Sequence, residues 1–143
     1  MRPAIMRQEP SNDQVGRVER FLIEPTNITP LIYYNEELNQ LEFRGKSSPE
    51  NAPGFYQQIH EWFDHESFKS MKSLTVEMSM AYFNTSSCKC LFMIFKKLNQ
   101  FKMDGMNMAV NWYYEEYDDD MMEAGEDFSE IFDMEFNLIE IEE

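Results

Sequence analysis

The sequence predicts an α/β fold, in which a single domain forms a mixed β-sheet with an N-terminal antiparallel hairpin and packs crossover helices on it. Short segments with an apolar residue at every second position alternate with segments whose apolar residues recur at helical spacing. Strands that are separated by helices need crossover connections, so at least part of the sheet is expected to be parallel. The 143 residues, of which 43% are hydrophobic, are enough for one core.

The chain divides into an extension and one domain. Residues 1–17 are polar, contain prolines and lack periodicity, and we expect them to form a mobile N-terminal extension. The domain is expected to cover residues 18–143. In order, its expected elements are strands at 18–24, 29–34 and 41–45, a helix at 53–64, a strand at 73–83, a helix at 86–102, a strand at 106–115, a helix at 118–132 and a strand at 135–141.

The elements of the first half rest on short signals. The polar turn Asn35-Glu36-Glu37 separates two apolar runs and predicts the hairpin. Before the first helix, Ser47-Ser48-Pro49-Glu50 combines a hydroxyl cap, a proline and an early acid, which are the signals of a helix start. The apolar stripe expected on this helix consists of Phe55, Ile59, Trp62 and Phe63.

The elements of the second half show clearer periodicity. The apolar face expected for the strand at 73–83 consists of Leu74, Val76, Met78, Met80 and Tyr82. In the helix at 86–102, lysines lie between the apolar positions, and Asp104-Gly105 is a typical helix end. The strand at 106–115 alternates again, and an acidic helix and a final strand follow it.

The net charge of −15 is unevenly distributed. Residues 103–143 contain 15 of the 27 acidic residues and no lysine or arginine, whereas residues 1–102 contain 12 acids and 12 bases. A surface of this charge repels a phosphate backbone, which argues against nucleic-acid binding. It would attract a basic partner surface, and it also suits a solvated face that keeps the protein soluble.

Composition also bears on the compartment. No apolar run approaches the roughly 20 residues of a membrane span, and the N-terminus lacks the apolar segment of a secretion signal. Cys88 and Cys90 lie two residues apart on a predicted helix, where their side chains point in different directions, so we expect free thiols. We therefore expect a soluble cytoplasmic protein that does not bind a membrane.

Three consecutive hydroxyls, Thr85-Ser86-Ser87, follow Asn84 where a strand gives way to a helix. The first backbone N–H groups of a helix lack partners, and the helix dipole favours negative charge there. A side chain at this place can cap the helix, which contributes about 1 kcal/mol. It can also carry a phosphate that those N–H groups stabilise. Capping accounts for one or two of these residues, and regulatory phosphorylation stays open for the others.

A metal site or catalytic site is weakly indicated. The acids Asp118–Asp120 could hold Mg²⁺ or Ca²⁺, but EF-hand spacing is absent, and capping of the next helix or a docking face is favoured. No zinc, phosphate-loop or nucleophile-elbow spacing accompanies His60 and His65. Cys88 could have a lowered pKa near a helix N-terminus, but it also belongs to the apolar stripe. We predict no catalytic residue, metal or cofactor. A metal-assisted enzyme that uses the acids near Asp118–Asp120 is the alternative, and an inert assembly subunit is a third.

Three segments carry a resemblance to a known family. They are Gly45 to Ala52 with Phe55 and Tyr56, Tyr82 to Ser87, and Trp112 to Glu116 with the acids that follow. In this order they resemble the SiaC family of bacterial regulatory phosphoproteins, over about residues 20–142. Cys88 departs from the family pattern, in which a small polar residue, usually serine, is expected. This removes one potential phosphate acceptor and leaves Thr85 intact.

The resemblance implies a non-enzymatic signalling adaptor that switches partners. In such proteins a dedicated Ser/Thr protein kinase phosphorylates one hydroxyl, and a metal-dependent protein phosphatase removes the phosphate. The unmodified form binds an output protein. In the best-known system this is a diguanylate cyclase, whose activation raises cyclic di-GMP and promotes aggregation or biofilm formation. By this resemblance the phosphate acceptor is Thr85, with Ser86 and Ser87 as lesser candidates.

The surface expected to bind partners has two parts. Its centre is expected at residues 82–89, and the acidic segment 115–127 is expected to add contacts with a basic partner. The predicted partner-binding residues are Tyr82, Asn84, Thr85, Ser86, Ser87, Lys89, Glu115, Glu116, Asp118 and Asp119.

Overall fold

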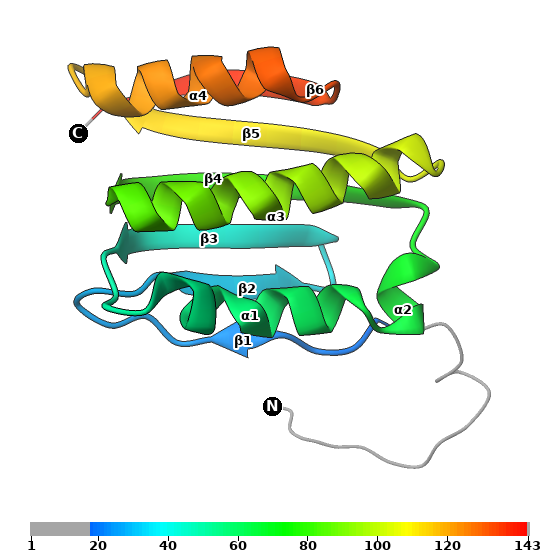
Figure 1. Cartoon of the computed structure of the whole chain (residues 1–143). Coiled ribbons are helices and arrows are strands. Elements are labelled where there is room, and N and C mark those ends of the chain that lie inside the picture. Colours follow the sequence, from blue (N-terminus) through cyan, green and yellow to red (C-terminus); the bar gives the residue numbers. More distant parts are fainter. Residues whose placement is uncertain (1–17, 143) are drawn as a thin grey trace.

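The computed structural model describes residues 18–142, so the predicted extension at 1–17 lies outside the described part. The described residues form six strands and four helices (Figure 1). In chain order these are β1 Leu22–Ile23, β2 Leu31–Asn35, β3 Gln40–Ser47, α1 Ala52–Phe63, α2 Glu66–Lys69, β4 Ser73–Phe83, α3 Thr85–Met103, β5 Asn107–Glu115, α4 Asp119–Ile131 and β6 Glu135–Ile141. None of these helices is long and apolar enough to cross a lipid bilayer.

The strands form one sheet whose spatial order, β1-β2-β3-β4-β5-β6, follows the chain. The pairs β1–β2 and β2–β3 are antiparallel, whereas β3, β4, β5 and β6 run parallel. Each crossover advances the chain by one strand in the same direction, and α1, α3 and α4 accordingly lie on the same face of the sheet (Figure 1). The predicted mixed sheet with an N-terminal hairpin is confirmed.

The core fills the space between the sheet and this helical layer. Its largest rings gather around Trp112 of β5, whose ring centroid lies 5.3 Å from that of Phe128 and 6.2 Å from that of Phe95. The buried apolar residues of β4 and α3 are Leu74, Val76, Met78, Met80, Leu91, Ile94, Phe95 and Leu98. Because close-packed side chains hold both elements, the junction between β4 and α3 has a rigid support.

Helix α4 approaches β5 closely because position 125 is glycine. A Cβ atom on Gly125 would lie 2.7 Å from Trp112 Cδ1 and 2.6 Å from Leu138 Cδ2. The indole N–H of Trp112 donates to the Met121 carbonyl at 3.0 Å, which fixes the ring against the helix. Position 125 therefore has little space for a larger residue.

Some predicted details of the first half are wrong. The first strand is only Leu22–Ile23, and a short helix, α2, occupies part of an expected loop. Helix α1 is capped by Asn51, whose Oδ1 accepts the Gly54 N–H at 3.1 Å, and not by the predicted hydroxyl. Ser47 is instead the last residue of β3 and is fully buried, because parallel pairing with β4 extends that strand.

Tyr82 does not belong to the apolar face of β4, contrary to the prediction. Gly45 pairs with Met80, but the next residue, Lys46, pairs with Tyr82, so the register shifts by one residue. This irregularity turns Tyr82 to the side of Lys46, and 51% of Tyr82 is exposed. A period-2 pattern in one strand cannot show a shift that depends on the neighbouring strand.

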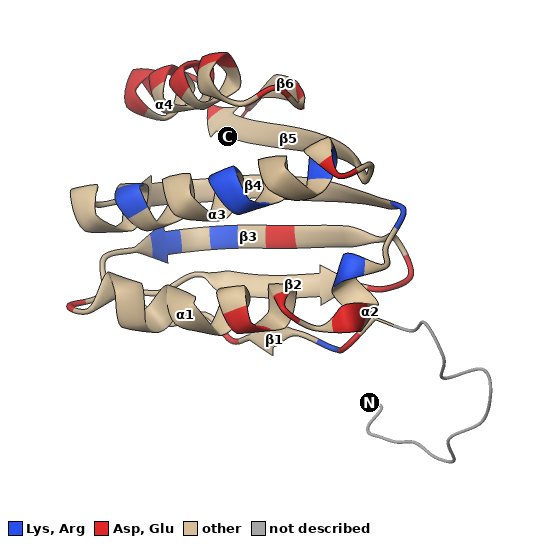
Figure 2. Cartoon of the chain, turned by 45° about the vertical axis from the view of Figure 1, so that its right-hand side comes forward, with Lys and Arg blue, Asp and Glu red and all other residues tan. Residues whose placement is uncertain are grey.

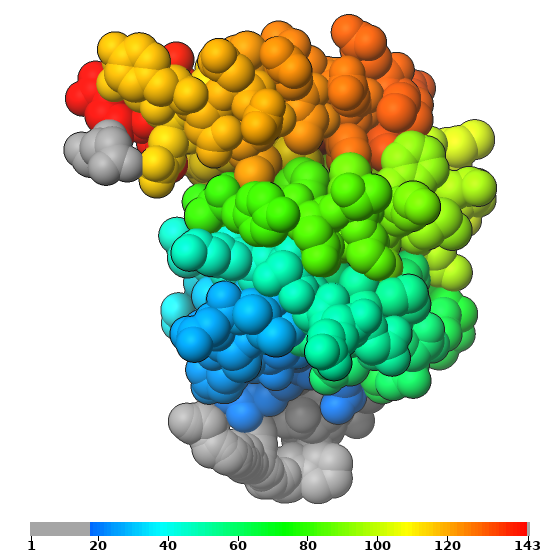
Figure 3. All heavy atoms as spheres, turned by 60° about the vertical axis from the view of Figure 1, so that its left-hand side comes forward, coloured from blue at the N-terminus to red at the C-terminus, as the bar shows by residue number. Residues whose placement is uncertain are grey.

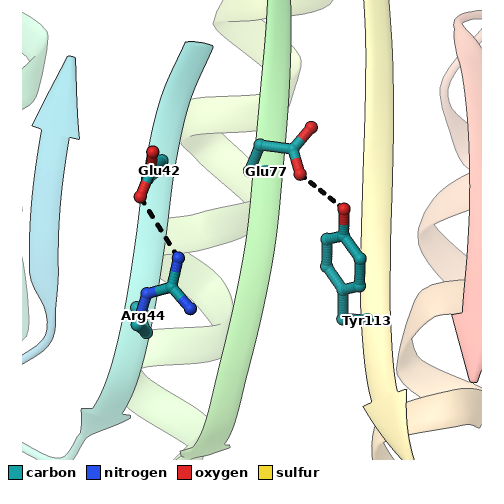
Figure 4. Close-up of polar contacts among 4 residues, drawn as sticks. All are labelled: Glu42, Arg44, Glu77 and Tyr113. Carbon is teal, nitrogen blue, oxygen red and sulfur yellow. Dashed lines mark hydrogen bonds and ion pairs between the residues drawn. The ribbon is translucent and has the colours of Figure 1, made fainter. Parts of the chain in front are cut away.

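The face of the sheet opposite the helices carries polar side chains that bond to one another (Figure 4). Glu77, in the middle of β4, accepts a hydrogen bond from the Tyr113 hydroxyl at 2.6 Å and another from Asn111 Nδ2 at 2.7 Å. Beside it, Arg44 donates to Glu42 at 3.2 Å. A shallow cavity of about 320 Å³ lies on this face and is lined by Gln40, Glu42, Arg44, Glu77, Ser79, Tyr113 and Ile141.

We expect Gly125→Ala to lower the free energy of unfolding by about 1–3 kcal/mol, because the added methyl group overlaps the fixed ring of Trp112. Denaturant-induced unfolding measures the change. Glu123→Ala is the control, since Glu123 is exposed on the same helix and its loss should change stability little. Equal stability of Gly125→Ala and wild type would show that α4 adjusts its position freely.

The hydrogen bond to Glu77 raises the pKa of Tyr113 to about 12, and burial adds to the effect. Since the usual value is 10.0, protonated Tyr113 favours the folded state below pH 10.0, and this contribution disappears as the pH rises through about 12. Glu77→Gln keeps an acceptor but removes the charge, so we expect the pKa of Tyr113 to fall. Absorbance titration, with Tyr113→Phe identifying the signal, measures it. An unchanged pKa would contradict the assigned cause.

Candidate functional site

The predicted phosphate acceptor lies where β4 ends and α3 begins. β4 ends at Phe83, Asn84 is the N-cap, and Thr85 is the first residue of the helix. Asn84 Oδ1 accepts the Ser87 N–H at 2.8 Å, and the Asn84 N–H donates to the Ser47 carbonyl at 3.0 Å. One residue thus caps the helix and ties it to the end of the neighbouring strand.

The three hydroxyls of this segment have different environments. Thr85 and Ser86 are exposed, whereas Ser87 is fully buried. Ser87 Oγ accepts a hydrogen bond from Ser47 Oγ at 2.7 Å, in the interior of the protein. Ser87, one of the lesser candidates, is therefore closed to a kinase in this conformation. Thr85 and Ser86, the other two predicted acceptors, lie at exposed positions.

The surroundings of Thr85 favour an anion. Within residues 18–142, the backbone N–H groups of Thr85 and Ser86 have no hydrogen-bond acceptor, and both lie at the positive end of α3. Lys89 is exposed one turn further along the same helix. In Figure 3 the green start of α3 lies between the cyan end of β3 and the orange residues of α4.

The acidic segment lies at the same edge of the sheet, after β5. Glu115, Glu116 and Asp119 are exposed, and Asp118 caps α4 by accepting the Met121 N–H on its Oδ1 at 3.1 Å. Among the described residues, no three His, Cys, Asp or Glu side chains are placed to hold a metal ion. The metal-assisted alternative therefore has no ligand cluster in this part of the chain, and of these acids Asp118 is the one that caps α4.

The other candidate reactive groups are not activated. Burial and the nearby Asp127 raise the pKa of the Cys88 thiol, which is the opposite of the lowering that a helix N-terminus could have caused. Burial also raises the pKa of Cys90, and both cysteines are half-buried and free. Burial, followed by the charge of Lys97, lowers the pKa of His60, so this side chain is a weak base in the structure.

The sequence analysis did not predict that two residues near the site, Ser47 and Tyr56, form a buried contact. Ser47 Oγ and the Tyr56 hydroxyl lie 2.7 Å apart, both in the interior below the start of α3. The sequence pattern predicts Ser47 at a helix start, and Tyr56 lies outside the predicted apolar stripe of its helix. Their contact joins β3 to α1, and no local sequence pattern in either segment predicts it.

We expect Asn84→Ala to lower the free energy of unfolding by about 1 kcal/mol, because it leaves the Ser87 N–H without its cap. Denaturant-induced unfolding tests this expectation. Thr85→Ala is the matched control, since the Thr85 side chain is exposed and its loss should change stability by less than about 0.5 kcal/mol. An equal loss in both variants would argue against the capping role.

Known proteins resemble this chain in sequence and in fold. The family model described as SiaC family regulatory phosphoprotein matches residues 23–141. An uncharacterised protein of Pseudomonas aeruginosa strain UCBPP-PA14 is 27% identical over 108 residues, which cover 76% of this chain and 86% of that protein. The crystal structure of apo-SiaC from P. aeruginosa matches with a TM-score of 0.74 and 26% identity, covering 85% of this chain and 98% of that one.

SiaC is also present in a crystal structure of the P. aeruginosa diguanylate cyclase SiaD in complex with its activator SiaC. The match there has a TM-score of 0.76 and 26% identity, and it covers 85% of this chain and 99% of that one. The family match extends to the last residue of β6 and includes the whole junction between β4 and α3. This chain belongs to the SiaC family of regulatory phosphoproteins.

Proposed function

We propose that this protein is a non-enzymatic adaptor whose binding to a diguanylate cyclase is switched by reversible phosphorylation of Thr85. The observation that carries the proposal is the exposed Thr85 at the first position of α3, beside unpaired backbone N–H groups. The complex of P. aeruginosa SiaC with SiaD supports a cyclase as the partner. A Ser/Thr kinase adds the phosphate and a metal-dependent phosphatase removes it. Through the cyclase, the switch controls cyclic di-GMP and biofilm formation.

The phosphate needs no large rearrangement of the fold. It adds a charge of about −1.5 to −2 and three acceptor oxygens. The N–H groups of Thr85 and Ser86 and the positive end of the helix dipole favour such a group where it is attached. Lys89, exposed on the next turn, adds positive charge on the same helix. The phosphorylated state is thus stabilised by groups that are already in place.

The unmodified protein is the binding form. A dianion in the middle of a contact surface must lose its water when the partner covers it, and this desolvation opposes binding. A loss of about 3 kcal/mol lowers the affinity more than a hundredfold. Phosphorylation therefore acts as an off signal at residues 82–89.

The acidic surface around α4 supplies a second contact. Glu115, Glu116, Asp118 and Asp119 lie at the sheet edge where α3 also begins. Opposite charge on a partner would accelerate encounter with this edge and make the association sensitive to salt. Binding that is independent of salt concentration would contradict this part of the proposal.

We expect Thr85→Ala to bind the host's cyclase constitutively and Thr85→Glu to bind it weakly. A pull-down from the native host, with this protein tagged, compares the variants with wild type. Ser86→Ala is the matched control, because it removes the neighbouring exposed hydroxyl and should leave regulation intact. Fragmentation of residues 73–89 from host-purified protein should locate the phosphate on Thr85.

Two results would overturn the proposal. One is equal partner binding by the phosphorylated and unmodified proteins. The other is a host-purified protein without phosphate on Thr85 under every growth condition in which its binding to the cyclase changes.

A further inference from the structure

We infer that Ser47, Tyr56 and Ser87 form a buried hydroxyl cluster that positions the first turn of α3 to stabilise a phosphate on Thr85. The three side chains come from the end of β3, from α1 and from α3. The inference rests on the proposed function, since it assigns a cause to the geometry of the same site. It makes Ser47, Tyr56 and Ser87 positioning residues, because they act through the helix and not by contact with the phosphate.

The cluster is a continuous chain of short hydrogen bonds. Ser47 Oγ lies 2.7 Å from the Tyr56 hydroxyl and 2.7 Å from Ser87 Oγ. Ser47 and Ser87 are fully buried, and Tyr56 is 1% exposed. Apart from buried tyrosines and tryptophans, Ser47 and Ser87 are the only buried polar or charged residues within residues 18–142. A polar group in such an interior is stable only with its partners in place.

The direction of the bonds follows from proton count. Ser47 donates its single hydroxyl proton to Ser87, so Tyr56 must donate to Ser47. Burial raises the pKa of Tyr56 to about 12, with the hydrogen bond to Ser47 acting in the opposite direction, so the phenol keeps its proton at physiological pH. The order of donors is therefore constant, and the cluster does not change with pH in the cell.

The cluster acts on the backbone of the first turn of α3 through two of its members, Ser47 and Ser87. Ser47 also accepts the Asn84 N–H on its carbonyl at 3.0 Å, and Ser87 also donates its N–H to Asn84 Oδ1 at 2.8 Å. Residues 84 and 87 are thus anchored, and Thr85 and Ser86 between them are exposed. The N–H groups of the two exposed residues are held in one orientation before any phosphate arrives, so little ordering entropy is lost when it is bound.

Positioning can be separated from stability. Removing one partner leaves a buried polar group unsatisfied, whereas replacing all of them with apolar groups of similar shape is nearly neutral. The variant Ser47→Ala/Tyr56→Phe/Ser87→Ala therefore removes the hydroxyl cluster and leaves no orphaned hydroxyl in it. A readout that follows the phosphate, and not the unfolding of the protein, then reports the orientation of the turn.

The test uses the full-length protein with phosphothreonine installed at position 85 during translation, so that no kinase is needed. Phosphorus NMR measures the second pKa of the phosphate, which is about 6 in an unstructured chain. We expect it to be lower by about 0.5 in the folded protein, the size of a helix N-terminal effect on a charge. In the triple variant it should rise toward the value of an unstructured peptide.

Single variants keep the test decisive if the triple variant does not fold. Tyr56→Phe should raise the pKa of the phosphate part of the way. Tyr34→Phe is the matched control, because it removes another buried tyrosine hydroxyl that donates to Asn39 Oδ1 at 2.8 Å, at the opposite end of β3. This control should leave the pKa of the phosphate at the wild-type value.

The measurements test the positioning role and the proposed function separately. A phosphate pKa that is the same in wild type, the triple variant and Tyr56→Phe would overturn the positioning role, whether or not Thr85 is modified in the host. Absence of phosphate on Thr85 in the host would overturn the proposed function and leave the measured pKa difference standing.

Discussion

The hydrogen bond from the Asn84 N–H to the Ser47 carbonyl, 3.0 Å long, joins the ends of two parallel strands at the point where α3 starts. Parallel strands end at the same edge of a sheet, so a helix that follows one of them starts beside the end of the other. Asn84 uses its backbone for the neighbouring strand and its side chain for the helix. The display of Thr85 depends on this double attachment.

The two parts of the chain differ in charge and in the structural elements that they supply. The first part, without net charge, supplies the anchored turn, the lysines of α3 and the buried hydroxyls. The last part carries all of the excess negative charge and forms one side of the molecule, where α4 packs on β5 and β6 (Figure 2). A dianion at Thr85 would lie at the same edge of the sheet as Glu115, Glu116 and Asp119, so it would extend the negative surface of the last part toward β3.

Much of the fold could be predicted, because periodicity is a local property. β4 and β6 have the predicted bounds, and α3 differs from its prediction by one residue at each end. The place of Thr85 at a helix start followed from the same patterns. The burial of Ser87 did not, since it depends on how α3 is rotated toward Ser47. The exposure of Tyr82 likewise depends on the pairing between β3 and β4, which no single segment encodes, whereas the Asn51 cap of α1 is a local bond to Gly54.

The anchors of the acceptor turn come from far along the chain: Ser47 and Ser87 are 40 residues apart. A short peptide with the sequence of residues 82–89 lacks both Ser47 at the end of β3 and Tyr56 of α1, which hold this turn in the folded protein. The arrangement of Thr85 and its neighbouring amides therefore exists only after β3, α1, β4 and α3 have assembled. An enzyme that recognises this arrangement binds only the folded protein, and it does not bind a newly made or unfolded chain.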